Sequence, residues 1–241
     1  METILEVRNL EKKYKNFSLK SINFNIGPGE IIGLIGQNGA GKSTLLKILM
    51  NIIDQDSGEI KFLSKLISKN EYNYKKNIGY VGENILFYEN QTLHEIKKFY
   101  CMYFPNWDED LYKKISSEVF NLDKNKKLKE LSKGMKVKFY ISLCISHKPK
   151  LFILDEPTSG LDLIVREKIL RILRDHVNEN ESGMIFSSHI TEDMDKIADK
   201  LIFIHDGNIL DVCDISDISR KNKTVDKYYK ELLIKNGVKY E

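Results

Sequence analysis

Cysteines, long apolar runs and an excess of charge of one sign are all scarce in this chain, and each scarcity excludes a class of protein. The three cysteines, Cys101, Cys144 and Cys213, lie far apart and form no CxxC pair. Neither a disulfide framework nor a cysteine-ligated zinc site is therefore indicated. This cysteine usage fits a reducing cytosol.

Apolar runs are short throughout. No stretch approaches the ~20 consecutive apolar residues that a membrane span needs. The first residues, Met1-Glu2-Thr3-Ile4, contain no basic segment followed by an apolar one, which a secretory signal would have. We expect a chain that neither enters nor crosses a bilayer by itself.

The charges nearly balance, with 38 basic and 35 acidic residues interspersed along the sequence. This balance gives no indication of a nucleic-acid partner. A hydrophobic content of 41% in 241 residues is sufficient for the core of a globular protein. Because no internal repeat or low-complexity linker interrupts the chain, we expect one domain over residues 1–241.

Short apolar runs between turn residues predict strands, with turns at Gly27-Pro28-Gly29 and Asp56-Ser57-Gly58. In the second half these runs alternate with helical patterns at Val165–Val177 and Thr191–Ala198. The alternation predicts a mostly parallel sheet that is buried on both faces. The expected strands are Ile4–Leu10, Ile22–Ile26, Ile31–Ile35, Ile78–Val81, Leu151–Leu154, Met184–Ser187 and Leu201–His205.

A helical insert is expected between about residues 84 and 146, where Lys-rich segments show helical spacing, as at Leu111, Ile115 and Val119. A last helix is expected at about residues 224–235, and little chain follows it. We therefore expect no further domain after this helix.

The segment Gly36-Gln37-Asn38-Gly39-Ala40-Gly41-Lys42-Ser43-Thr44 fits GxxxxGK[ST], follows an apolar strand and opens an apolar-periodic helix. Glycines let the backbone N–H groups wrap around phosphates, and the helix N-terminus adds positive potential. We expect Lys42 to contact the β- and γ-phosphates, Ser43 to bind Mg²⁺ and Thr44 to contact phosphate. An accidental glycine-rich turn is the alternative, and the flanking strand and helix argue against it.

Two carboxylates, Asp155 and Glu156, stand at the carboxyl end of the Leu151–Leu154 run, which is the edge where α/β sheets bind ligands. We expect Asp155 to hold Mg²⁺ directly or through water. Glu156 would point to the other side of the strand end and act as general base for the water that attacks the γ-phosphate. Alone, this pair could be an acidic turn; beside a phosphate loop it predicts hydrolysis.

Upstream of the acidic pair, Leu131-Ser132-Lys133-Gly134-Met135 precedes a helical segment and resembles the LSGGQ signature of ATP-binding-cassette (ABC) ATPases. Ser159-Gly160-Leu161-Asp162 resembles the D-loop of this family, and His189 resembles its switch histidine. The resemblance covers roughly residues 5–210. It implies an α/β P-loop NTPase fold with a RecA-like, mostly parallel core, an antiparallel β subdomain and an α-helical signature subdomain.

The resemblance also implies a dimer closed around ATP. Ser132 suits the N-cap of the following helix, whose unpaired N–H groups attract an anion. By resemblance that anion is the γ-phosphate on the opposite subunit, and Ser132, Gly134 and Asp162 bind the nucleotide. His189 would contact the γ-phosphate and position the attacking water. Tyr14 occupies the place of the aromatic residue that stacks on adenine, with an ordinary strand-end tyrosine as the alternative.

Two motifs depart from the common form of the family. Lys133 and Met135 replace a glycine and a glutamine of the signature, while Ser132 and Gly134 are retained, so activity is still expected. Glu83 stands where the family's Q-loop has a glutamine. Its carboxylate can still contact Mg²⁺ or its water, and its charge can change how nucleotide occupancy reaches a membrane subunit.

The family implies a motor subunit that binds ATP and Mg²⁺, pairs with a second ABC ATPase subunit and drives a transmembrane permease. Its place would be cytoplasmic, peripheral on the inner face of the cell membrane through the permease. The Ser-Lys-Gly-Met signature and the segment Asp226-Lys227-Tyr228-Tyr229 resemble ABC-2-type exporters of drugs and antimicrobial peptides. The transported substrate would be chosen by the membrane subunit.

Aromatic residues between Phe87 and Trp107 are expected mainly in the core, with two or three of them lining a groove for a helix of the membrane subunit. Two other functions compete with transport. One is a soluble ABC ATPase in cofactor assembly or another non-transport role. The other is a catalytically silent cassette, which the presence of Lys42, Asp155, Glu156 and His189 opposes.

Overall fold

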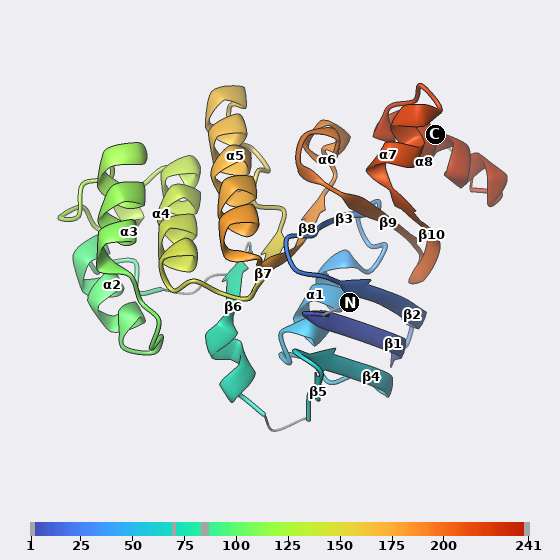
Figure 1. Ribbon diagram of the computed structural model, residues 1–241, viewed down its shortest axis with the longest axis horizontal. Coiled ribbons are helices and arrows are strands. Elements are labelled where there is room, and N and C mark those ends of the chain that lie inside the picture. Colours follow the sequence, from blue (N-terminus) through green and yellow to red (C-terminus); the bar gives the residue numbers. More distant parts are fainter. Residues whose placement is uncertain (1–2, 69–70, 83–86, 239–241) are drawn as a thin grey trace.

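The computed structural model describes residues 3–68, 71–82 and 87–238 and contains two β-sheets flanked by helices (Figure 1). The larger sheet has six strands in the order β10-β9-β3-β8-β7-β6. Neighbouring strands in it are parallel except β10, which pairs antiparallel with β9. Its strands are β3 (Ile31–Ile35), β6 (Ile78–Val81), β7 (Leu151–Asp155), β8 (Gly183–Ser188), β9 (Lys200–His205) and β10 (Asn208–Asp214). The predicted mostly parallel core is confirmed.

The smaller sheet is antiparallel, with the order β2-β1-β4-β5. Its strands are β1 (Leu5–Lys13), β2 (Ser18–Ile26), β4 (Ser57–Phe62) and β5 (Lys65–Leu66). The turn expected at Asp56-Ser57-Gly58 is corrected here, because Ser57 and Gly58 already belong to β4. Gly58 has φ +90°, and a Cβ there would lie 2.4 Å from the carbonyl oxygen of Asn9. Glycine is needed at this close approach of two strands.

Helices cover the larger sheet and form a separate group at one end of it (Figure 1). The group at the end contains α2 (Leu93–Cys101), α3 (Glu109–Lys113), the π-helix η2 (Lys114–Val119), the short η3 (Leu128–Glu130) and α4 (Lys133–Ser146). The other helices are α1 (Lys42–Leu49), η1 (Asn73–Asn77), α5 (Leu163–Asn180), α6 (Thr191–Ile197), α7 (Ile215–Arg220) and α8 (Val225–Lys235). The helical spacing at Leu111, Ile115 and Val119 is thus divided between α3 and η2.

The larger sheet separates two hydrophobic cores, because side chains alternate between its faces. On β3, Ile31 and Ile35 face the core formed with α4, α5 and α6. Ile32 and Leu34 face the core shared with α1 and the antiparallel sheet. Burial on both faces leaves the strand ends as the accessible edge of this sheet. Among the described residues, no helix combines the length and apolar character that crossing a bilayer requires.

Candidate functional site

The loop between β3 and α1 adopts a backbone that glycine permits. Gly39 and Gly41 have φ of +82° and +111°. A Cβ on Gly41 would also lie 2.7 Å from carbon atoms of Phe17 and Leu19, so glycine is required there by conformation and by space. Helix α1 begins at the next residue, Lys42, and no side chain among the described residues caps it. Its first N–H groups are therefore available to an anionic ligand.

Lys42 is folded back over this loop. Its ammonium group donates to the carbonyl oxygen of Gly36 at 2.7 Å and to that of Gln37 at 3.3 Å. It also lies 3.8 Å from Oε1 of Glu156, and its side chain is 7% exposed. A buried cation needs such partners, since loss of water would otherwise raise its free energy. The loop thus concentrates positive charge beside the carboxyl end of β7.

The end of β7 carries both predicted carboxylates. Asp155 is buried and accepts a hydrogen bond from the hydroxyl of Ser187 at 2.7 Å. The N–H of Glu156 donates to the same Ser187 oxygen at 3.0 Å. Glu156 has φ +51°, a left-handed conformation that is uncommon for a residue with a side chain. The chain therefore turns sharply at Glu156, and the carboxylates of Asp155 and Glu156 have different surroundings.

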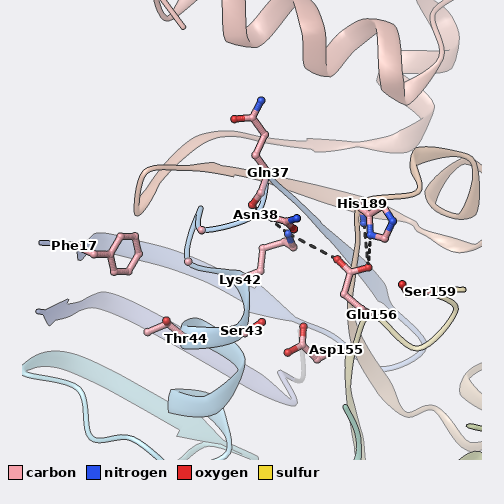
Figure 2. Close-up of a pocket in the computed structure, with 12 residues that line it drawn as sticks. Phe17, Gln37, Asn38, Lys42, Ser43, Thr44, Asp155, Glu156, Ser159 and His189 are labelled. Atoms are coloured by element: carbon pink, nitrogen blue, oxygen red, sulfur yellow. Dashed lines mark hydrogen bonds and ion pairs between the residues drawn. The ribbon is translucent and has the colours of Figure 1, made fainter. Parts of the chain in front are cut away.

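His189 follows β8 and meets Glu156 directly. Nδ1 of His189 lies 2.6 Å from Oε2 of Glu156, and the backbone N–H of His189 donates to the same oxygen at 3.4 Å. The His189 side chain is 55% exposed, whereas that of Glu156 is 14% exposed. Figure 2 shows the Glu156 carboxylate between Lys42 and His189. Three predicted catalytic residues, from three separate segments, are brought together.

A cavity of about 520 Å³ joins these groups, and twelve described residues line it (Figure 2). Most of the predicted nucleotide and metal residues are among them. Gly36 and Ala40 belong to the same loop but lie outside the lining set. The lining residues are Phe17, Gln37, Asn38, Gly39, Gly41, Lys42, Ser43, Thr44, Asp155, Glu156, Ser159 and His189.

Two lining residues, Phe17 and Ser159, were not predicted for this cavity. Tyr14, the predicted adenine-stacking residue, is 45% exposed and lies outside the described lining set. Its N–H donates to the carbonyl of Phe17 at 2.7 Å, and the two ring centroids are 6.4 Å apart. The turn between β1 and β2 therefore presents two aromatic rings, of which Phe17 lines the cavity. A signal existed in the sequence, because Phe17 is a second aromatic residue beside the same turn.

The signature residues lie outside the lining set of this cavity and begin another helix. The Ser132 hydroxyl accepts from the N–H of Met135 at 3.3 Å, so the predicted N-cap of α4 is confirmed. A Cβ on Gly134 would lie 3.3 Å from Leu161, which places the signature against the Ser159-Gly160-Leu161-Asp162 segment. Asp162 caps α5 by accepting from Val165 N–H at 3.0 Å. Glu83 lies outside the described residues.

The geometry fits a nucleoside triphosphate. An uncapped helix N-terminus, two glycines with positive φ and a buried lysine surround one side of the cavity, and such donors bind phosphate. Ser43 and Asp155 supply oxygen atoms on the same cavity wall, as Mg²⁺ prefers. The described residues contain no group of three or more His, Cys, Asp or Glu side chains suited to a metal. Mg²⁺ held by the Ser43 and Asp155 oxygens would complete its coordination with water and phosphate oxygens.

Comparison with known proteins decides the family. The family model described as ABC transporter matches residues 19–159, more than half of the chain and the span from β2 to the D-loop-like segment. The chain belongs to the ABC transporter family. The predicted resemblance is confirmed, and this ABC transporter subunit binds ATP and has ATPase activity.

Similar proteins align over most of this ABC transporter subunit. It is 31% identical over 219 residues to the ABC transporter ATP-binding protein YtrB of Bacillus subtilis (strain 168), covering 90% of this chain and 74% of the relative. It is 34% identical over 209 residues to the lantibiotic transport ATP-binding protein SrtF of Streptococcus pyogenes, covering 86% and 89%. A solved structure of the ATP-binding subunit of an ABC transporter matches with a TM-score of 0.84 and 28% identity, covering 95% of this chain and 99% of that chain. The P-loop NTPase fold and the role as a transport motor subunit are thereby confirmed.

Proposed function

We propose that this subunit is the motor of an ABC exporter, in which two ATPase subunits close around two MgATP and separate after hydrolysis. The convergence of Lys42, Glu156 and His189 beside the phosphate loop carries the proposal. It combines a cation for the phosphates with a carboxylate and an imidazole for the attacking water. Phosphoryl transfer depends on this kind of positioning and charge stabilisation.

Within one subunit, Glu156 is the general base and His189 orients it. The 2.6 Å contact holds the Glu156 carboxylate at the cavity wall, where it can take a proton from water. Lys42 exchanges its contacts with loop carbonyl oxygens for contacts with the β- and γ-phosphates. Ser43 and Asp155 would hold Mg²⁺, which would neutralise developing charge on the phosphates. Tyr14 stays a prediction for adenine, and Phe17 joins it because Phe17 lines the cavity.

Between subunits, Ser132 and Gly134 bind the γ-phosphate held by the second ABC ATPase subunit. Support comes from the N-terminus of α4, where Ser132 accepts from Met135 N–H and the first N–H groups face outward from the helix end. Asp162 takes part through the D-loop-like segment that packs against Gly134. ATP then favours the closed state because it contacts both subunits in that state.

The membrane partner is a transmembrane permease, and it holds the motor at the inner face of the membrane. We assign its docking to the exposed apolar side chains at the end of α2. Phe99, Met102 and Tyr103 are 57%, 78% and 57% exposed, and the rings of Phe99 and Tyr103 lie 5.1 Å apart. Exposed apolar clusters of this kind accept an amphipathic helix.

Export of an antimicrobial peptide or related compound is the transport class that we assign. Its support is the 34% identity to SrtF, which is described as a lantibiotic transport protein, together with the Ser-Lys-Gly-Met signature. The cavity described above is lined by groups for phosphate and provides no cargo site. The permease therefore selects the substrate.

Light scattering after size-exclusion chromatography tests the motor. Glu156→Gln retains the shape and hydrogen bonding of the side chain while removing the base, so bound ATP should persist. We expect a monomer without nucleotide and a dimer with MgATP. The same variant carrying Ser132→Arg should remain monomeric with MgATP. A monomer of Glu156→Gln at saturating MgATP would contradict the homodimer.

Co-purification tests the permease contact. Phe99→Ser together with Tyr103→Ser should reduce recovery of the permease that is co-expressed with this subunit. The control is Tyr72→Ser, which removes another aromatic ring, 63% exposed, at the start of η1. Equal recovery of the permease with the wild type, the double variant and Tyr72→Ser would contradict docking at α2.

A further inference from the structure

The C-terminal helix α8 reaches the phosphate loop through one side chain. The hydroxyl of Tyr229 accepts a hydrogen bond from the backbone N–H of Gln37, with 3.2 Å between the two atoms. These residues are 192 positions apart in the sequence. Gln37 lines the nucleotide cavity, whereas Tyr229 is buried and lies outside the described lining set.

This contact and the Lys42 contact hold the two ends of a single peptide unit. The carbonyl of Gly36 accepts from the Lys42 ammonium at 2.7 Å, and the N–H of the same unit, on Gln37, donates to Tyr229. A trans peptide is planar and its C=O and N–H point in opposite directions. No cis peptide occurs in the described chain. The orientation of the Gly36–Gln37 peptide is therefore fixed from opposite sides.

The surroundings of Tyr229 make it a rigid support. Its ring stacks on Phe203 of β9, with centroids 5.6 Å apart and an interplanar angle of 22°. The next residue, Ile204, closely approaches the loop, since a Cβ on Gly36 would lie 2.5 Å from its carbonyl oxygen. Residues that support a binding loop in this way reduce the ordering that the ligand must impose.

Helix α8 itself is fixed at its beginning. The Thr224 hydroxyl caps it by accepting from Lys227 N–H at 3.3 Å. The N–H of Val225 donates to Asp195 of α6 at 3.4 Å. These contacts prevent the helix from moving freely relative to the sheet, so Tyr229 has a defined position.

We propose that Tyr229 is a positioning residue for nucleotide binding. When Lys42 leaves the Gly36 carbonyl to contact phosphate, Tyr229 keeps the other end of the peptide in place. The N–H groups of the following loop residues then retain the directions needed to surround phosphate. Tyr229 acts through Gln37 and itself touches no nucleotide. The proposal relies on ATP binding by this family and adds the C-terminal helix to the determinants of affinity.

Two neighbouring tyrosines provide a matched test in the full chain. Tyr229→Phe keeps the ring that stacks on Phe203 and removes the acceptor for Gln37. Tyr228→Phe makes the same chemical change one residue away and removes the donor to Asp211. For each variant, titration with a fluorescent ATP analogue gives Kd, steady-state hydrolysis gives KM and kcat, and thermal melting gives Tm.

Tyr229→Phe should raise Kd and KM for ATP about 3- to 10-fold, the range expected for one hydrogen bond, with kcat changed less than about twofold. Tyr228→Phe should retain the Kd and KM of the wild type even if its Tm falls. Unchanged Kd and KM in Tyr229→Phe would overturn the proposal, as would equal increases in the two variants. If the wild type binds no ATP analogue, the ATPase assignment fails instead, so the two failures are distinguishable.

Discussion

Glu156 and His189 lie side by side, with 2.6 Å between Oε2 of the carboxylate and Nδ1 of the ring. The other carboxylate oxygen of Glu156 is 3.8 Å from the ammonium of Lys42. Glu156 also has a left-handed backbone, which neighbouring structure must stabilise. The backbone N–H of Glu156 supplies that stabilisation by donating to the hydroxyl oxygen of Ser187 at 3.0 Å and to its carbonyl oxygen at 3.1 Å. The arrangement places one carboxylate between a cation and an imidazole.

Removal of the Glu156 charge should stop hydrolysis while leaving ATP binding intact. We expect Glu156→Gln to lower kcat at least 100-fold, because general-base catalysis contributes about 10²–10⁴-fold. Phosphate release at saturating MgATP measures kcat, and titration with a fluorescent ATP analogue measures Kd. The matched control is Glu118→Gln on η2, an exposed glutamate outside the described lining set of the cavity. A turnover near that of the control would remove Glu156 from the role of base.

Lys42 should contribute mainly to nucleotide affinity. Its ammonium is 7% exposed and contacts loop carbonyl oxygens and Glu156, so a phosphate can replace these partners without a large movement of charge into water. Lys42→Ala should raise the Kd for ATP at least about tenfold, as expected for loss of charged hydrogen bonds. Lys47→Ala, on the last turn of the same helix, is the control. Isothermal titration of both variants measures the difference, and equal affinities would contradict the role of Lys42.

Patterns that are local in the sequence predicted most of the site. The phosphate loop and the Asp155–Glu156 pair each combine a strand end with a turn or helix start, so residues close in sequence determine their geometry. The central strands were predicted for the same reason, because burial on both faces leaves continuous apolar runs. Strand β10 was not predicted: its residues are at most partly buried, so such a run is lacking there.

Contacts between distant segments could not be predicted in this way. Tyr229 and Gln37 meet because β9 and α8 pack beside the loop, and nothing near Tyr229 in the sequence indicates that partner. The cavity-lining role of Phe17 depends on how the turn between β1 and β2 folds, which also determines the exposure of Tyr14. Only the assembled sheets define these relationships.

Asp193 on α6 pairs with Arg166 on α5, and its removal should destabilise the fold. The carboxylate is fully buried, accepts from Thr158 at 2.7 Å and lies 3.0 Å from Nε of Arg166. Burial raises its pKa, while Thr158 and Arg166 favour the charged form. We expect Asp193→Ala to lower the free energy of unfolding by about 3 kcal/mol, because Arg166 loses a buried partner.

The neighbouring Glu192 supplies the control for that change. It pairs with the same Arg166 at 3.2 Å, but its side chain is 75% exposed. An exposed ion pair contributes less than about 1 kcal/mol, so Glu192→Ala should be nearly neutral. Urea unfolding at pH 7.5 followed by circular dichroism compares the two variants. Similar losses of stability in both would show that burial of Asp193 is not what matters.

Two buried histidines should make the protein less stable in mild acid. Burial lowers the pKa of His147 to about 3 and that of His176 to about 4. His147 is stacked on Phe104 with ring centroids 4.0 Å apart, and neither of its ring nitrogens has a hydrogen-bond partner among the described residues. In the unfolded chain a histidine has a pKa of about 6.5, so below that pH the unfolded state binds protons that the folded state does not.

Stability is therefore lost as the pH falls from about 6.5 towards 4, by up to about 1.4 kcal/mol per pH unit for each histidine. His147→Phe keeps an aromatic ring in the core and removes one titrating group, so its loss of stability between pH 6 and 5 should be smaller by about 1 kcal/mol. His94→Phe, which replaces an exposed ring, should retain the slope of the wild type. Urea unfolding at several pH values measures these slopes. A slope for His147→Phe equal to that of His94→Phe would mean that His147 takes up its proton in the folded protein, and the core around Phe104 would then have to admit a charge.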